Sequence, residues 1–176
     1  MKYFNELKRS MEFLAKNKKT FFLGQAVEVQ GSAMRNTLKN INKKKLLELP
    51  VAEEMQMGMT IGMLMCNYIP VSIFPRWNFL LLALNQLVNH LDKLPEMSNN
   101  HYKSKAIIRT GVGSQRPLHP QSQHISDFTK SVRLMTKSIV VVKLNEPNQI
   151  YKEYKKALIR RESTILVEYG DYYSEK

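Results

Sequence analysis

The sequence predicts an α/β fold in which a mainly parallel sheet lies between two layers of helices, a three-layer α/β/α domain. Short apolar runs alternate along the chain with longer stretches of helical periodicity. Several runs, such as residues 20–23 and 138–142, lack the polar alternation of a half-exposed strand. Strands buried on both faces are typical of parallel sheets covered by crossover helices. A chain of 176 residues can bury one sizeable core, so we expect a single domain over residues 1–176.

In the first half of the chain, three predicted helices alternate with three predicted strands. Apolar residues recur at spacings of three and four over residues 3–16, which indicates an amphipathic helix. The other expected elements are a strand at 20–23 ended by Gly24, a loop at 25–31, a short helix at about 32–40, a strand at 45–49, a helix at about 52–66 and a strand at 71–74.

The second half continues the alternation. A long helix is predicted from Trp77 to about Leu94, because apolar residues cover much of its surface. The remaining expected elements are a polar loop at 95–104, a strand at 106–108, a loop at 109–123, a helix at about 125–134, a strand at 138–142, a helix at 146–161 and a strand at 164–167. A loop as long as 109–123 inside a compact domain is usually functional.

The charge is strongly positive, with 27 Lys and Arg against 15 Asp and Glu. Such an excess can indicate nucleic-acid binding. The lysines, however, form short clusters such as Lys18-Lys19 and Lys43-Lys44-Lys45, and no aromatic-interleaved basic stripe accompanies them. A solvated surface therefore explains the excess best, and nucleic acid is not an expected partner. Binding to an acidic partner or to nucleic acid stays open as an alternative.

The single cysteine, Cys66, rules out an intrachain disulfide and a cysteine-based metal site. Within its apolar run it is expected to be a small buried residue. The longest apolar stretch, residues 57–66, is about half as long as a membrane-spanning helix needs to be. The N-terminus also lacks the pattern of a signal peptide. We expect no membrane association and a cytoplasmic location.

Few residues in the sequence can carry chemistry. No glycine-rich phosphate loop, His-Cys metal cluster or nucleophile elbow is present. Glu53 and Glu54 follow a predicted strand and begin a predicted helix, and ligands of parallel sheets bind at such junctions. An acid in the first helical turn also has a structural explanation, because the helix dipole favours it. Gly58 and Gly62 share a helix face and predict close packing against another backbone, preferably a helix of a partner chain.

A series of short landmarks follows one another along the chain. They are Phe22-Leu23-Gly24, Leu49-Pro50-Val51-Ala52-Glu53, the glycine-rich segment 58–63, Tyr68-Ile69-Pro70-Val71, Asn78-Phe79, Asn85-Gln86-Leu87-Val88-Asn89, Met97-Ser98, Ile107-Ile108-Arg109 and Gln123-His124. Together they cover most of residues 3–170. In this order they resemble the pyrimidine-binding domain of transketolase-like enzymes, as found in the β subunit of pyruvate and branched-chain 2-oxo acid dehydrogenases.

The resemblance implies that the chain takes part in binding thiamine diphosphate. Glu53 would hydrogen-bond the aminopyrimidine ring and activate the cofactor through a protonated carboxyl, a form that burial favours. Phe79 would pack against the ring, and Gly24 would lie at the cofactor. His124 would face the substrate and stabilise charge there. The implied catalytic residues are Glu53 and His124, and the implied cofactor-binding residues are Glu53, Phe79 and Gly24.

The resemblance also implies a partner chain. The Gly-Asp-Gly…Asn motif that holds Mg²⁺ and the diphosphate is not in this sequence, and in the family it lies on an α-type subunit. We therefore expect a hetero-oligomer, or a homodimer core, that acts by oxidative decarboxylation of a 2-oxo acid or by ketol transfer from a sugar phosphate. Gln25 replaces an acid of the family, and the family's C-terminal domain is not expected to follow. These departures leave open a non-catalytic interaction module that keeps the fold and the subunit interface.

Overall fold

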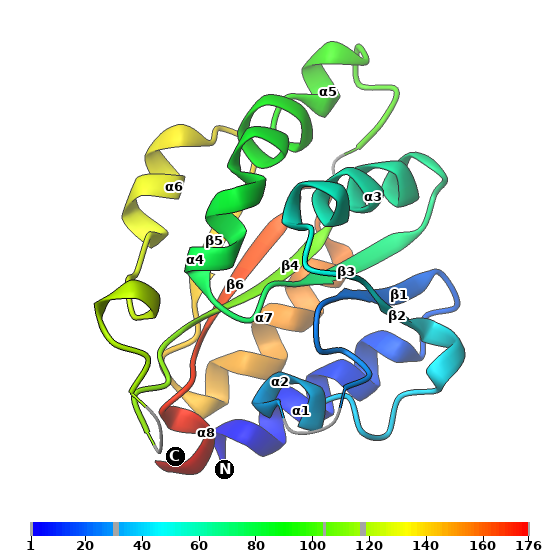
Figure 1. Cartoon of the computed structure of the whole chain (residues 1–176). Helices are drawn as coiled ribbons and strands as arrows, with labels where there is room; N and C mark the ends of the chain where they lie inside the picture. Colours follow the sequence, from blue (N-terminus) through cyan, green and yellow to red (C-terminus); the bar gives the residue numbers. More distant parts are fainter. Residues whose placement is uncertain (1, 30–31, 104, 117–118, 176) are drawn as a thin grey trace.

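The computed structural model describes residues 2–29, 32–103, 105–116 and 119–175, and at its centre lies a six-stranded sheet (Figure 1). The strands are β1 (Thr20–Gly24), β2 (Leu46–Glu48), β3 (Ile69–Ile73), β4 (Ile107–Val112), β5 (Val140–Lys143) and β6 (Thr164–Tyr169). They lie in the order β2-β1-β3-β4-β6-β5, and each neighbouring pair is parallel. The predicted α/β class with a parallel sheet is confirmed.

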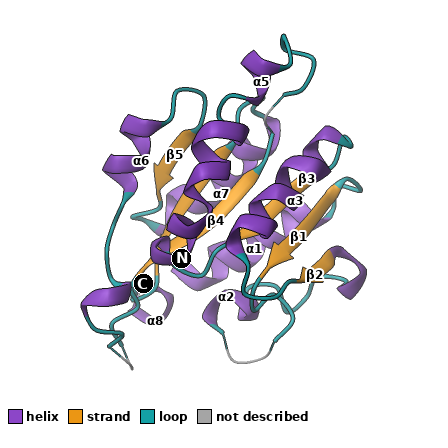
Figure 2. Ribbon diagram, turned by 45° about the horizontal axis from the view of Figure 1, so that its top comes forward, coloured by secondary structure: helices purple, strands orange, loops and turns teal. Residues whose placement is uncertain are grey.

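Helices cover the sheet on both faces (Figure 2). They are α1 (Tyr3–Ala15), α2 (Ala33–Asn36), α3 (Glu53–Met65), α4 (Trp77–Leu80), α5 (Leu94–Met97), α6 (Thr129–Met135), α7 (Pro147–Ile159) and α8 (Tyr172–Glu175). Short 3₁₀ helices lie at Lys43–Lys45, Leu81–Ala83 and Ser122–His124, and a π-helix lies at Gln86–Leu91. Among the described residues, no helix combines the length and the apolar character needed to cross a bilayer.

The core consists of two apolar clusters, one on each face of the sheet. The first joins the strands to α1 and α7, and the second joins them to α3, α4 and the π-helix. Neighbouring residues of one strand belong to opposite clusters: Ile107 packs into the first and Ile108 into the second. In β6, Leu166 and Ile165 divide in the same way. Because both strand faces are buried, the strands carry no polar alternation.

Most predicted elements are confirmed to within a few residues, with three exceptions. The helix predicted from Trp77 to Leu94 is broken into α4, a 3₁₀ turn and the π-helix. Helix α5 begins at Leu94 and extends into the segment predicted as a polar loop. The predicted loop at 109–123 is wrong at its start, because β4 continues to Val112 in register with β6. Helix α8 was not predicted. The parts of the predicted loops at residues 30–31, 104 and 117–118 lie outside the described residues.

Cys66 is exposed, so the prediction of a buried cysteine is wrong. The residue is the C-cap of α3, and Asn67 after it has a positive φ of 64°. The chain therefore turns away from the core at this point, and the apolar run in the sequence ends outside the packed part of the helix.

The order of the strands creates a switch point between β1 and β3. From β1 the chain continues outward to β2, whereas from β3 it continues to β4 on the other side. Since all the strands are parallel, their carboxyl ends meet at one edge of the sheet. Ligands of open α/β sheets bind outside the carboxyl ends at such a switch point. The sequence places Gly24 and Gln25 here, beside Ile73 and Phe74.

Candidate active site

Glu53 is a buried carboxyl at the carboxyl edge of the sheet. It is the first residue of α3 and follows β2 closely, and only 3% of its surface is exposed. The Nε2 of Gln25, just after β1, donates a hydrogen bond of 2.9 Å to Oε1 of Glu53. Within the part of the chain that the structure describes, Oε2 of Glu53 receives no hydrogen bond. One carboxyl oxygen is therefore held in place, and the other is left for a ligand.

The carboxyl of Glu53 lines a shallow hollow of about 450 Å³. Ala52, Glu54, Met55 and Leu82 form the rest of the lining. Met55 exposes 42% of its surface and Leu82 exposes 57%, although both are apolar. Val51, two residues before Glu53, is 79% exposed. A buried carboxyl bordered by exposed apolar side chains is the arrangement expected of a site that a second surface completes.

Gly24 fixes the position of Gln25. Its φ of +147° lies in the region that favours glycine, and a Cβ on it would lie 2.3 Å from the carbonyl oxygen of Ile73. The same Cβ would lie 3.0 Å from Nε2 of Gln56, which donates hydrogen bonds to Ser72 Oγ and to that carbonyl of Ile73. Gly24 thus allows β1 and β3 to approach closely where Gln25 leaves the sheet. Its predicted contact with a cofactor stays a prediction.

The structure brings Phe79 and His124 together. Their ring centroids are 5.3 Å apart, with 41° between the planes. Phe79 lies on α4 and His124 ends a 3₁₀ helix in the long loop after β4. The Nδ1 of His124 is buried and has no hydrogen-bond partner among the described residues. In the same part of the chain, neither ring shares a hydrogen bond or ring contact with Glu53, so the predicted site residues form two separate groups.

Arg76, which the sequence reasoning missed, anchors the loop that carries His124. Its Nη1 donates hydrogen bonds to the carbonyl of Gly113 at 2.7 Å and to the carbonyl of His124 at 2.9 Å. Burial lowers the pKa of Arg76, and the charge of Asp171 opposes this effect. Its position in the sequence could have indicated a role, because Arg76 closely follows the predicted strand at 71–74. Ligand-binding side chains of a parallel sheet lie after the carboxyl ends of its strands.

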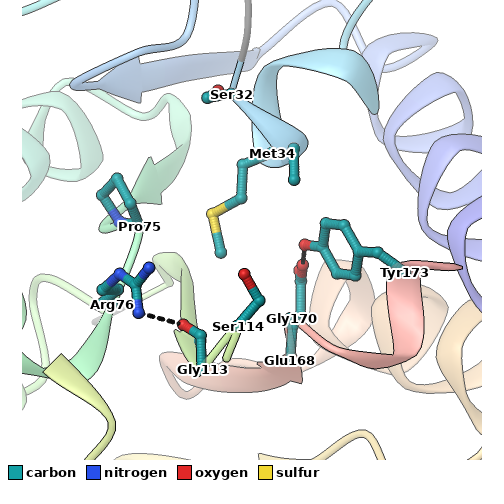
Figure 3. A pocket seen from close by; sticks show the side chains of 11 residues that line it. Ser32, Met34, Pro75, Arg76, Gly113, Ser114, Glu168, Gly170 and Tyr173 are labelled. Carbon is teal, nitrogen blue, oxygen red and sulfur yellow. Dashed lines mark hydrogen bonds between the residues drawn. The ribbon is translucent and has the colours of Figure 1, made fainter. Parts of the chain in front are cut away.

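Beside Arg76 lies a cavity of about 250 Å³ (Figure 3). Figure 3 shows Met34 of α2, Pro75, Ser114 and Tyr173 of α8 around it. The cavity lies at the same edge of the sheet as Glu53, but the two hollows share no lining residue.

Glu168 closes this cavity on the side of the sheet and forms a buried ion pair. Arg109 on β4 donates to both of its carboxylate oxygens, at 2.7 Å from Nε and 2.9 Å from Nη2. The hydroxyls of Tyr154 and Tyr173 donate to Glu168 as well. Burial and the charge of Glu168 raise the pKa of the Tyr154 hydroxyl. The network joins β4, β6, α7 and α8, so the arginine that the sequence placed at the end of a strand is a core residue.

Gly58 and Gly62 lie on an exposed face of α3. No atom lies within 4 Å of a Cβ built on either residue. Within the described residues, the glycines therefore approach no other backbone, and their predicted packing against a partner chain stays a prediction. Also within those residues, no group of three or more His, Cys, Asp or Glu is placed to hold a metal ion.

The fold matches that of a transketolase-like protein. A solved chain from an inactive β4 tetramer of a split-gene transketolase superposes with a TM-score of 0.69. The match covers 93% of this chain and 49% of that chain, at 14% sequence identity. The predicted resemblance of the fold is confirmed.

Curated relatives define the resemblance more closely. Pyruvate dehydrogenase E1 component subunit beta of Cyanidium caldarium is 26% identical over 171 residues, which are 94% of this chain and 50% of that protein. The same subunit of Staurastrum punctulatum is 31% identical over 126 residues, 69% of this chain and 38% of that protein. The 2-oxoisovalerate dehydrogenase subunit beta of Bacillus subtilis (strain 168) is 24% identical over 172 residues, 94% of this chain and 51% of that protein.

The chain spans about half, or less, of the length of these curated relatives. No protein-family model matches the sequence. The chain is thus similar to β-type subunits of 2-oxo acid dehydrogenases over one part of those proteins, and it has the fold of transketolase-like pyrimidine-binding domains.

Proposed function

We propose that this chain is the pyrimidine-binding, β-type component of a thiamine-diphosphate-dependent enzyme. The observation that carries the proposal is the buried carboxyl of Glu53, which lines a hollow at the switch point of the sheet. The similarity to E1 beta subunits supports it. The reaction class is oxidative decarboxylation of a 2-oxo acid or ketol transfer from a sugar phosphate.

The residues around Glu53 fit a pyrimidine ring. Gln25 holds Oε1, which leaves Oε2 for a nitrogen of the ring. Met55 and Leu82 supply apolar surface for its flat faces. Bound thiamine diphosphate supplies a nucleophilic carbon that attacks carbonyl groups. In this proposal Glu53 holds a proton at the ring nitrogen, Phe79 lies beside the ring, and His124 faces the substrate.

A partner chain completes the site in this proposal. The exposed apolar side chains of Val51, Met55 and Leu82 would be covered by an α-type subunit that holds Mg²⁺ and the diphosphate. The open helix face at Gly58 and Gly62 would pack against a helix of a partner chain, because glycines let two backbones approach closely. The single free cysteine suits a reducing compartment, so a cytoplasmic location is part of the proposal.

A specific observation favours a second function, a non-catalytic interaction module. Gln25 donates an amide hydrogen bond to Glu53 at the place where the resemblance expects an acid. An amide cannot exchange a proton with Glu53 as a carboxyl can. A chain that kept the fold and the interface without the proton chemistry would show this replacement.

The test is co-expression with a chain that carries the Gly-Asp-Gly…Asn motif, followed by calorimetry with thiamine diphosphate and Mg²⁺. We expect binding by the pair and not by either chain alone. Glu53→Gln should abolish activity and keep assembly. Glu96→Gln is the matched control, because Glu96 is an exposed acid on α5 that does not line the hollow. A pair that assembles without binding thiamine diphosphate would support the interaction module instead.

A further inference from the structure

A second, basic pocket lies at the opposite edge of the sheet. It has a volume of about 480 Å³, and Lys19, Lys103 and Lys105 lie in its lining. The side chains of Tyr68 and Tyr102 also line it. No Asp or Glu belongs to this lining. The three lysines therefore give the pocket a net positive charge.

The amino ends of three neighbouring strands form this pocket. Lys19 directly precedes β1, Tyr68 directly precedes β3, and Lys105 lies shortly before β4. These strands are adjacent in the sheet. At about 3.3 Å per residue, strands of this length separate the pocket from the carboxyl edge by roughly 15–20 Å. The basic pocket and the candidate active site are distinct.

The lysines of the pocket have no acidic partner of their own. Within the described part of the chain, the side chains of Lys19, Lys103 and Lys105 form no ion pair. Burial, and then the charge of Lys103, lower the pKa of Lys105, so an anion placed between the two lysines would favour its charged form.

Three carbonyls in the last turn of α3, beside the pocket, accept backbone hydrogen bonds. The backbone N–H groups of Cys66, Asn67 and Tyr68 donate to the carbonyls of Gly62, Leu64 and Met63 at 3.1, 2.9 and 3.0 Å. The bonds from Asn67 and Tyr68 satisfy acceptors that a helix C-terminus otherwise leaves free, and they hold Tyr68 against the end of the helix.

Each of the two tyrosine rings is held by a perpendicular ring contact. Tyr68 contacts Phe21 with centroids 5.3 Å apart, and Tyr102 contacts His101 at 4.7 Å. Tyr68 remains 44% exposed. The pocket thus presents a positioned aromatic surface beside three unpaired cations. Such a combination suits a ligand with both a planar ring and a chain of phosphates.

We propose that this pocket binds an organic polyphosphate with a planar ring, of the class of nucleoside triphosphates. Lys19, Lys103 and Lys105 bind the phosphates, and Tyr68, the more exposed of the two tyrosines, packs against the ring. An acidic polypeptide would also be attracted by the lysines, but it would make no use of the ring surface. The proposal does not depend on the proposed function, because the two sites share no residue.

The experiment is isothermal calorimetry of the full chain with ATP, tripolyphosphate, adenosine and a polyglutamate peptide. We expect ATP to bind more tightly than tripolyphosphate, and adenosine and polyglutamate to bind weakly. Lys103→Gln/Lys105→Gln should weaken ATP binding by roughly tenfold or more. Lys152→Gln/Lys155→Gln is the matched control, because it removes the same charge from exposed positions of α7 and should have no effect.

The ring contact has a separate test. Tyr68→Leu should lower the affinity for ATP to that for tripolyphosphate and leave the tripolyphosphate affinity unchanged. The wild-type comparison of the two ligands tests the same contact without a variant, should Tyr68→Leu fail to fold. Equal affinity for ATP and polyglutamate, equal affinity for ATP and tripolyphosphate, or equal losses in the two lysine double variants would each overturn the proposal.

Discussion

The amide of Gln25 donates a hydrogen bond of 2.9 Å to the buried carboxyl of Glu53, although 28 positions separate the two residues in the chain. The contact joins the loop after β1 to the first turn of α3. It leaves one oxygen of Glu53 for a ligand and fixes the direction in which the carboxyl points. The positioning of the proposed catalytic acid therefore depends on its partner as well as on its burial.

Removing this donor should destabilise the protein. Gln25→Leu leaves the buried Oε1 of Glu53 unsatisfied, which costs about 1–3 kcal/mol in the free energy of unfolding. Urea denaturation of the isolated chain measures the loss. Glu54→Gln serves as the control, because an exposed acid should contribute less than about 0.5 kcal/mol. A variant Gln25→Leu as stable as the wild type would show that the bond contributes nothing to the folded state.

Alanine substitutions at Gly24 and Gly58 should change the free energy of unfolding in opposite directions. Gly24→Ala places a Cβ 2.3 Å from the carbonyl oxygen of Ile73 at a φ of +147°, so we expect a loss of about 2 kcal/mol or more. Gly58→Ala meets no neighbour in a helix interior, so the isolated chain should gain up to about 1 kcal/mol.

The same Gly58→Ala variant tests the proposed interface. If a partner helix packs on this face, the added methyl group should weaken the association with the partner chain while the isolated chain becomes more stable. Thermal unfolding of the isolated chain and analytical ultracentrifugation of the pair measure the two effects. Unchanged assembly would exclude Gly58 from a close helix contact.

Replacing only one residue of the Arg109–Glu168 ion pair should strongly lower the free energy of unfolding. Both side chains are at most 1% exposed, so Glu168→Gln leaves the arginine charge buried without its counter-charge. Breaking a buried pair in this way costs about 3–5 kcal/mol. The double variant Arg109→Met/Glu168→Gln should be less destabilised than Glu168→Gln alone, because it removes the unpaired charge. Chemical denaturation of the wild type, Glu168→Gln and the double variant checks this order, and a double variant that is destabilised as much as Glu168→Gln or more would contradict it.

The Asp127–Lys143 ion pair predicts a pH dependence of stability. The Nζ of Lys143 lies 2.7 Å from Oδ2 of Asp127, and both side chains are partly exposed. Burial pushes the pKa of Asp127 up, but hydrogen bonds from Lys143 and Thr129 outweigh it and hold that pKa below its ordinary value. The hydrogen bond to Asp127, followed by one to Tyr169, raises the pKa of Lys143, against a smaller opposing effect of burial.

The lowered pKa of Asp127 and the raised pKa of Lys143 both stabilise the folded state at pH values between the two pKa values. The contribution of Asp127 is present above its unfolded pKa of about 3.9 and is lost as the pH falls through its lower folded pKa. The contribution of Lys143 is present below about pH 10 and is lost as the pH rises through its higher folded pKa. Asp127→Asn should therefore destabilise the protein slightly at pH 7. It should have no effect at a pH below the folded pKa of Asp127, where the wild-type carboxyl is protonated. Urea denaturation midpoints of both proteins at these two pH values measure the difference. An equal loss at both would contradict the assignment.

The sequence predicted the sheet well because its strands are buried on both faces. All five residues of β3, Ile69–Ile73, are buried, and the parallel order follows from the alternation with helices. The sequence placed Arg109 at the boundary between a strand and a loop and did not predict that its side chain is buried. Its burial depends on Glu168, which lies far along the chain and is brought near only by the pairing of β4 with β6.

The candidate site could be predicted only in part. The strand-to-helix junction predicted a role for Glu53, and the landmarks predicted roles for Phe79 and His124. The rings of Phe79 and His124 lie together, and the roles of all three residues stay predictions. The contact between Gln25 and Glu53 could not be predicted from the sequence, because it depends on the pairing of β1 with β2 in the sheet. The exposure of Met55 and Leu82 also could not be foreseen, since apolar residues on a helix are most simply read as core.

The most direct test of the central claim measures the exchange of the thiazolium C2 proton of thiamine diphosphate for deuterium, by NMR, in the assembled pair. The proposed role of Glu53 predicts that Glu53→Gln slows this exchange by about 100-fold or more while the variant pair still binds the cofactor. Glu96→Gln changes an exposed acid of α5 outside the hollow and should exchange at the wild-type rate. Wild-type exchange in a pair that carries Glu53→Gln would contradict the assignment of Glu53 as the activating acid.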